Sequence, residues 1–151
     1  MRSNMELITI LMADDDPDDR LLVEDAFEEV QLKNSIDFVK DGVELMDYLF
    51  QRGAYSSLAG SPPPGLILLD LNMPKKDGRQ ALREIKEDAK LRLIPVVILT
   101  TSQADEDILR SYDLGANSFI VKPVTFDKLV DIIRKVTNYW FQIVRRPGEG
   151  D

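Results

Sequence analysis

Short apolar runs alternate with segments of helical period along this chain, and no other feature restricts its fold as strongly. Three runs rich in Ile, Leu and Val, at residues 6–13, 65–70 and 94–101, have the nearly continuous hydrophobicity of strands buried on both faces. Two shorter candidate strands lie at residues 35–41 and 117–123. Each strand is followed by a segment of helical period, at residues 17–32, 43–52, 78–89, 105–114 and 125–144. Five strand–helix repeats predict an α/β fold: a doubly wound five-stranded parallel sheet with helices on both faces.

The length of the chain fits one domain. With 151 residues, 44% of them hydrophobic, it can build one well-packed core and is too short for two domains of ordinary size. We expect this domain at residues 6–137, with an N-terminal extension at residues 1–5. Residues 138–151 would prolong the last helix and end in a polar tail. No apolar run approaches a membrane span and no export leader is visible, so we expect a cytoplasmic protein without membrane contact.

The chain has no cysteine and no histidine, which narrows its chemistry. Disulfides, thiolate or histidine zinc sites, and catalysis by Ser-His or Cys-His pairs are excluded. Carboxylates, hydroxyls and lysines remain as the reactive groups. The formal net charge of −8 repels the phosphate backbone, so we expect protein partners and no nucleic acid.

Five aspartates lie within the six residues after the first predicted strand, and three of them have a structural explanation. Asp16 before Pro17 is typical of a helix N-cap followed by proline at the first helical position. Asp18 and Asp19 would then lie in the first turn, where the helix dipole favours negative charge.

Asp14 and Asp15 lie at the carboxyl end of the first strand and have no such explanation. Two adjacent carboxylates repel each other unless a cation or a proton joins them, so this pair is a candidate site. A calcium-binding EF-hand loop would need glycine where the chain has Asp19, and Pro17 would interrupt the loop. These two residues argue against the EF-hand interpretation.

Polar residues also end the later strands. Asp70 ends the third strand, so we expect it to approach Asp14 and Asp15 at one edge of the sheet. Three carboxylates with room for water favour Mg²⁺ over an enclosed calcium site. Thr100 ends the fourth strand and Lys122 the fifth, where a hydroxyl and an ammonium could contact a transferring phosphoryl group.

These residues resemble a known family, the response-regulator receiver domains of two-component signalling. The resemblance covers roughly residues 6–137 and rests on the acidic pair, "LLDLNMP", "VILTTS" and "IVKP" after successive strands. It implies a flavodoxin-like receiver architecture with Asp70 as the phosphoacceptor. It further implies that Asp14, Asp15, Asp70 and the Asn72 backbone carbonyl bind Mg²⁺.

The resemblance also implies a phosphorylation switch. A partner histidine kinase would supply the phosphoryl group, and the domain would catalyse only its own phosphotransfer and dephosphorylation. Thr100 would bind a phosphoryl oxygen and Lys122 would pair with it. Phe119 lies at the aromatic switch position, where many receivers have tyrosine. The phosphoryl group could also pass to a histidine phosphotransfer protein.

A narrower resemblance concerns the partner. The stretches "YLFQRGAYSS", "LILLDLNMPKKDGR" and "NYWFQIV" and the proline-containing loop are similar to the small stand-alone receivers paired with bacterial and cyanobacterial phytochromes. This resemblance implies a phytochrome as the sensor histidine kinase.

The last predicted helix carries more apolar residues than one core-facing stripe needs. A helix that is apolar on more than one side implies a second partner surface. We therefore expect homodimerisation or kinase docking here, through Ile132, Tyr139, Trp140, Phe141 and Ile143.

Three alternatives remain beside the phosphorylated receiver. A haloacid-dehalogenase-like phosphohydrolase would need a second carboxylate two residues after Asp70, where this chain has Asn72. A flavodoxin-like flavin carrier would need phosphate donors after the first strand, where "DDDPDD" repels phosphate. A degenerate receiver could act as an adaptor that does not depend on phosphorylation. The complete set of site residues argues against this third alternative.

Overall fold

The computed structural model describes residues 9–30, 35–73, 75–100, 118–121 and 125–138. Side chains are described throughout these ranges except at residues 100, 118–121 and 136–138. The expected helix at residues 105–114 lies outside the described residues, as do residues 1–5 and 139–151 of the expected extensions.

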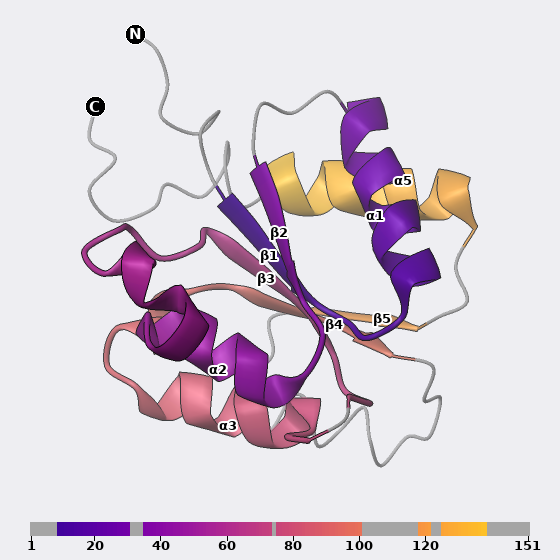
Figure 1. Cartoon of the computed structure of the whole chain (residues 1–151). Coiled ribbons are helices and arrows are strands. Elements are labelled where there is room, and N and C mark those ends of the chain that lie inside the picture. Colours follow the sequence, from indigo (N-terminus) through magenta and orange to yellow (C-terminus); the bar gives the residue numbers. More distant parts are fainter. Residues whose placement is uncertain (1–8, 31–34, 74, 101–117, 122–124, 139–151) are drawn as a thin grey trace, which may run out of the picture.

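The five predicted strands form one parallel sheet (Figure 1). They are β1 (Thr9–Ala13), β2 (Ser35–Val39), β3 (Leu66–Asp70), β4 (Val96–Thr100) and β5 (Ser118–Val121). Their order in the sheet is β2-β1-β3-β4-β5, which is the flavodoxin-like arrangement. The direction of winding reverses between β1 and β3, so the carboxyl ends of these two strands are the expected place for a site.

Helices cover both faces of the sheet (Figure 1). One face carries α1 (Pro17–Val30) and α5 (Phe126–Asn138), and the other carries α2 (Gly42–Phe50) and α3 (Gly78–Glu87). Alternate strand residues pack into the two cores: Leu69 lies among α2 and α3 residues, and its neighbour Leu68 among α1 and α5 residues. Among the helices that the structure describes, none combines the length and hydropathy needed to cross a membrane.

The start of α1 agrees with the prediction from the aspartate run. Pro17 is the first helical residue, and the Asp16 side chain accepts a hydrogen bond from the Asp18 amide at 2.9 Å. The Asp16 carbonyl accepts from the Arg20 amide, as the residue before a helix should. Asp16 is therefore confirmed as the N-cap.

The end of α2 differs from the prediction. This helix ends at Phe50 instead of residue 52, because Gln51 adopts a left-handed conformation with a φ of 56°. The Gln51 amide side chain then fixes the next loop by donating to the Ser61 carbonyl and accepting from the Gly60 amide. A short 3-10 helix (Gly53–Leu58) lies between α2 and β3, where the sequence predicted neither a helix nor a strand.

Two tyrosine hydroxyls connect α2 to β2 and to this 3-10 helix. The Tyr48 hydroxyl donates to Asp37 of β2 at 2.5 Å, and the Tyr55 hydroxyl donates to Glu44 of α2. The two rings lie 5.1 Å apart between centroids. Burial and the bond to Glu44 raise the pKa of Tyr55 to about 12, and burial and Asp37 raise the pKa of Tyr48 still further.

Candidate functional site

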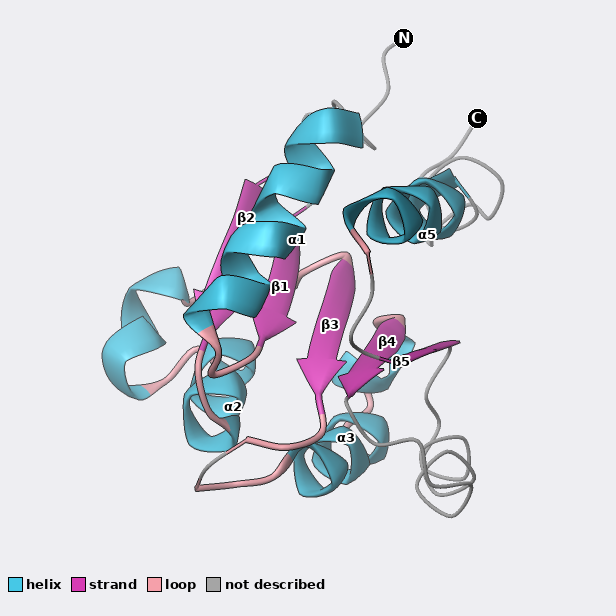
Figure 2. Ribbon diagram, turned by 90° about the vertical axis from the view of Figure 1, so that its right-hand side faces the viewer, coloured by secondary structure: helices cyan, strands magenta, loops and turns pink. Residues whose placement is uncertain are grey.

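Three carboxylates meet at the carboxyl edge of the sheet. Asp14 directly follows β1, Asp15 is next in the chain, and Asp70 is the last residue of β3. Because β1 and β3 pair in parallel with Ala13 opposite Leu69, their carboxyl ends point to the same side of the sheet (Figure 2). One oxygen from each carboxylate lies within 4.8 Å of the others. The predicted approach of these three side chains is confirmed.

The burial of the three side chains differs. Asp14 is 0% exposed and Asp70 6%, whereas Asp15 is exposed. Two buried carboxylates so close together repel each other in a medium that screens charge poorly. The site therefore favours a bound cation, and the exposed side of Asp15 leaves room for water.

Backbone contacts hold Asp14 in place. Its carboxylate Oδ1 accepts a hydrogen bond from the Asp16 amide at 2.9 Å, and its own amide donates to the Val39 carbonyl at 3.0 Å. The Arg20 side chain donates to the Asp14 carbonyl at 3.0 Å. Asp14 thus also stabilises the turn into α1, a structural role that the sequence did not indicate.

Asp70 is held by the loop that follows it. Its carboxylate Oδ1 accepts from the Asn72 amide at 3.1 Å, and the Asn72 side chain is exposed. The Leu71 carbonyl accepts from the amide of Gly78, the first residue of α3. A side chain at Gly78 would bring a Cβ to 2.4 Å from the Asp70 carbonyl oxygen, so only glycine allows α3 to begin this close to the site.

The donor set suits a hard divalent cation. Every group that converges is a carboxylate oxygen, and Mg²⁺ or Mn²⁺ prefers such ligands when several positions stay open for water. A thiolate or imidazole site is excluded by the sequence, which has no cysteine or histidine.

The remaining predicted site residues are described only in part. In the register of β3 and β4, Asp70 pairs with Leu99, so the backbone of Thr100 follows directly beside the acidic site. Thr100 pairs with Val121 of β5, and Phe119 pairs with Ile98. The side chains of Thr100 and Phe119 lie outside the described residues, and so does Lys122 altogether.

The predicted partner surface is described at one residue. Ile132 is half-buried and packs against the core between α1 and α5, so part of its apolar surface is already covered. The other four residues of that prediction lie outside the described residues: Tyr139, Trp140, Phe141 and Ile143.

Two residues at the start of α2 were not found from the sequence. Asp41 is 5% exposed and caps α2, with its Oδ1 accepting from the Glu44 amide at 2.7 Å. Gly42, the first residue of α2, is buried against the loop after β3. An Asp-Gly pair at a helix start was the available signal, but it indicates a cap and says nothing of the distant loop.

The domain is similar to known signalling proteins over nearly its whole length. Residues 10–134 match the model of the response regulator receiver domain. Response regulator Rcp1 of Synechocystis sp. is 38% identical over 139 residues, covering 92% of each chain.

Solved structures show the same similarity. The phosphorylated cyanobacterial phytochrome response regulator RcpA is 40% identical, with a TM-score of 0.83 over 93% of this chain and 99% of that one. The Mn²⁺-bound form of Rcp1 is 37% identical, with a TM-score of 0.81 and the same coverage.

Proposed function

Because this chain belongs to the response regulator receiver family of two-component signalling, we propose that Asp70 accepts a phosphoryl group from a sensor histidine kinase. The observation that supports this role is the position of Asp70, at the end of the central strand beside Asp14 and Asp15. Membership of this family also argues against the dehalogenase-like and flavin-carrier interpretations.

We assign the metal site to four groups of this chain. Asp14, Asp15 and Asp70 would hold Mg²⁺ directly or through water, and the Asn72 backbone carbonyl would add a further oxygen. The metal would supply positive charge to the phosphoryl oxygens during transfer. The relative Rcp1 has been solved with Mn²⁺, an ion with similar ligand preferences.

The proposed transfer is a displacement at phosphorus. A carboxylate oxygen of Asp70 attacks in line, an O–P bond forms, and the P–N bond to the kinase histidine breaks. This chain cannot supply the phosphohistidine itself, since it has no histidine. The hydroxyl of Thr100 and the ammonium of Lys122 then bind the new phosphoryl oxygens. Phe119 turns inward in response, and the surface that partners read changes.

The partners follow from the relatives. Three of the similar solved proteins are named as response regulators of a cyanobacterial phytochrome or of bacteriophytochromes, so a phytochrome is the kinase class we propose. A histidine phosphotransfer protein is the proposed next acceptor, which would take the phosphoryl group from Asp70. We further propose a homodimer formed through the end of α5, and a cytoplasmic location for the domain at residues 6–137.

The test is phosphorylation by acetyl phosphate, followed by intact mass. We expect a Mg²⁺-dependent, base-labile adduct in the natural chain and none in Asp70→Asn. Asp77→Asn is the matched control, because it makes the same chemical change on the same loop and keeps a good helix cap. No adduct in the natural chain under any condition would instead favour the phosphorylation-independent adaptor.

A further inference from the structure

The loop that leaves Asp70 packs against the first residue of α2. A Cβ added to Gly42 would lie 1.9 Å from the Lys76 carbonyl oxygen and 2.6 Å from the Lys76 Cβ. Ordinary contact begins near 3.4 Å, so no side chain fits between α2 and this loop as they stand. The backbone of Lys76 occupies the space that a side chain at residue 42 would need.

Space, and not backbone conformation, explains glycine at this position. The described glycines with positive φ are Gly53 and Gly60, and Gly42 is not among them. In an isolated helix, alanine at a helical position would be better than glycine by up to about 1 kcal/mol. The close approach of Lys76 is therefore what opposes a larger residue at position 42.

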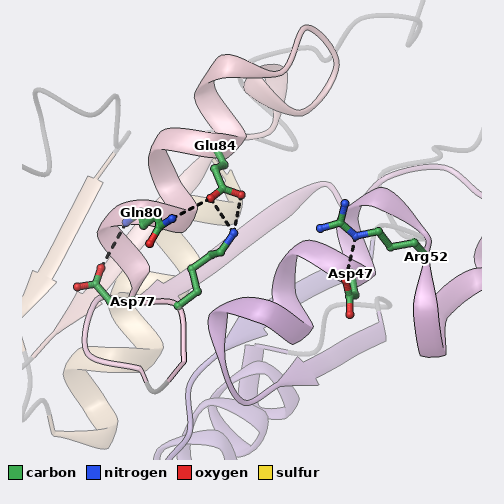
Figure 3. A network of polar contacts seen from close by, with 6 residues as sticks. Asp47, Arg52, Asp77, Gln80 and Glu84 are labelled. Atoms are coloured by element: carbon green, nitrogen blue, oxygen red, sulfur yellow. Dashed lines mark hydrogen bonds and ion pairs between the residues drawn. The ribbon is translucent and has the colours of Figure 1, made fainter.

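Ion pairs hold the same part of the loop from both sides. Lys75 lies 3.5 Å from the Asp41 carboxylate at the start of α2, although its φ of 67° is unusual for a residue with a side chain. Lys76 donates to both carboxylate oxygens of Glu84 on α3, at 2.7 and 2.8 Å. Figure 3 shows Glu84 and Gln80 joined on α3, with Asp77 at the start of that helix.

The other end of the loop returns to the acidic site. Gly78 follows the held segment and donates to the Leu71 carbonyl at 2.9 Å. At Gly78, an added Cβ would lie within 2.6 Å of both the Asp70 carbonyl oxygen and the Leu71 Cα. A shift of Lys76 away from α2 would therefore move the backbone that carries Asp70 and Asn72.

We propose that Gly42 is a positioning residue of the metal site and that it acts through Lys76. By leaving room for the loop, it lets Asp70 and the Asn72 carbonyl converge with Asp14 and Asp15. This inference rests on the proposed function, since the metal site it serves is part of that function.

The test is the affinity of the full chain for Mn²⁺ alone. Electron paramagnetic resonance measures the concentration of free Mn²⁺ at equilibrium, and the affinity follows from it. We expect Gly42→Ala to weaken binding about tenfold, as changes to groups that orient metal ligands commonly do. Gly60→Ala is the matched control: its φ of 87° strains alanine, but nothing lies within 4 Å. The control should lower the metal-free Tm and leave the Mn²⁺ affinity unchanged. Natural affinity in a folded Gly42→Ala variant overturns the inference.

A second variant covers the case in which Gly42→Ala does not fold. Lys75→Gly removes the ion pair with Asp41 and suits the positive φ, so the fold should keep its Tm or gain stability. We expect its Mn²⁺ affinity to fall about threefold, a smaller loss than for ligand-orienting groups in general, because the Lys75 side of the pair is exposed to solvent. Unchanged affinity in this variant would overturn the role of the α2 contact.

The outcomes separate this inference from the proposed function. A natural chain that neither binds Mn²⁺ nor forms the acetyl phosphate adduct removes the proposed function and the inference together. A natural chain that does both, beside a Gly42→Ala variant that binds Mn²⁺ equally well, removes the inference alone.

Discussion

Asp14 combines two roles that oppose each other at the scale of a single residue. Its carboxylate stabilises the turn into α1 through the Asp16 amide, and the same carboxylate is buried within reach of Asp70. The first contact needs an acceptor atom, and the second places negative charge beside negative charge. An amide in place of the carboxylate would keep the acceptor and remove the charge.

We therefore expect Asp14→Asn to stabilise the metal-free protein while weakening its metal site. The free energy of unfolding without metal should rise by about 1 kcal/mol, because the repulsion with Asp70 is gone. Mn²⁺ affinity should fall at least about tenfold, since a charged ligand is lost. Urea unfolding in a chelating buffer and Mn²⁺ titration measure the two effects.

Asp15→Asn is the control for the effect on metal-free stability. Asp15 is exposed, so its charge is screened and its replacement should change metal-free stability little. A metal-free Asp14→Asn that is less stable than the natural chain would contradict the explanation.

The sequence predicts the acidic site but not the backbone contacts that hold it in place. Asp14, Asp15 and Asp70 could be brought together from the order of strands alone, because parallel strands end at one edge. Gly42 could not, since its reason is the backbone of Lys76, which is distant in sequence. A contact of this kind leaves no local pattern in the chain.

At the scale of elements, α2 and the 3-10 helix after it act as one unit. The five predicted strands and the predicted helices within the described residues were found near their expected places, because buried strands and amphipathic helices have strong periods. The end of α2 was not, since a glutamine carries no sign that it will adopt a left-handed conformation. The bond from Tyr55 to Glu44 then fixes the 3-10 helix on α2.

This bond predicts a loss of stability at alkaline pH. The pKa of Tyr55 is raised from 10.0 to about 12 by burial and then by the bond to Glu44. A raised pKa means that the folded state binds the proton more tightly, so its contribution is complete below pH 10 and is lost as the pH rises toward 12. Urea unfolding across this range should show a falling free energy of unfolding.

Tyr55→Phe should reduce the fall of the unfolding free energy at alkaline pH. The variant should be less stable than the natural chain at neutral pH by on the order of 1 kcal/mol, the value of one hydrogen bond. The difference between the two should shrink as the pH rises, and the phenolate absorbance step of Tyr55 should be missing. A constant difference up to pH 12 would show that this hydroxyl does not couple folding to pH.

At the scale of the whole molecule, the sheet separates two cores that share the same strands. Leu68 is 5% exposed and packs with α1 and α5, whereas Leu69 is 0% exposed and packs with α2 and α3. Adjacent residues of one central strand thus belong to different layers. We therefore expect the two layers to lose their packing together.

Truncation of either leucine should therefore weaken the molecule as a whole. We expect Leu68→Ala and Leu69→Ala each to cost about 2–5 kcal/mol of unfolding free energy, with a single transition in circular dichroism and in fluorescence. Leu93→Ala is the matched control, since Leu93 is 70% exposed and its loss should cost less than about 0.5 kcal/mol. Two separate transitions in either core variant would mean that the layers unfold independently.

Because the strands are parallel, their amino ends lie on the side of the sheet opposite the acidic site. The stretch that Gln51 fastens through Gly60 and Ser61 leads into the amino end of β3, while Asp70 lies at its carboxyl end. A strand of this length places roughly 13 Å between the two ends. Ser61 is exposed, so a fluorophore or a fusion joint attached there would stand at the opposite edge from the acidic residues. An attachment point at Ser61 would thus be separated from the acidic site by the full length of the central strand.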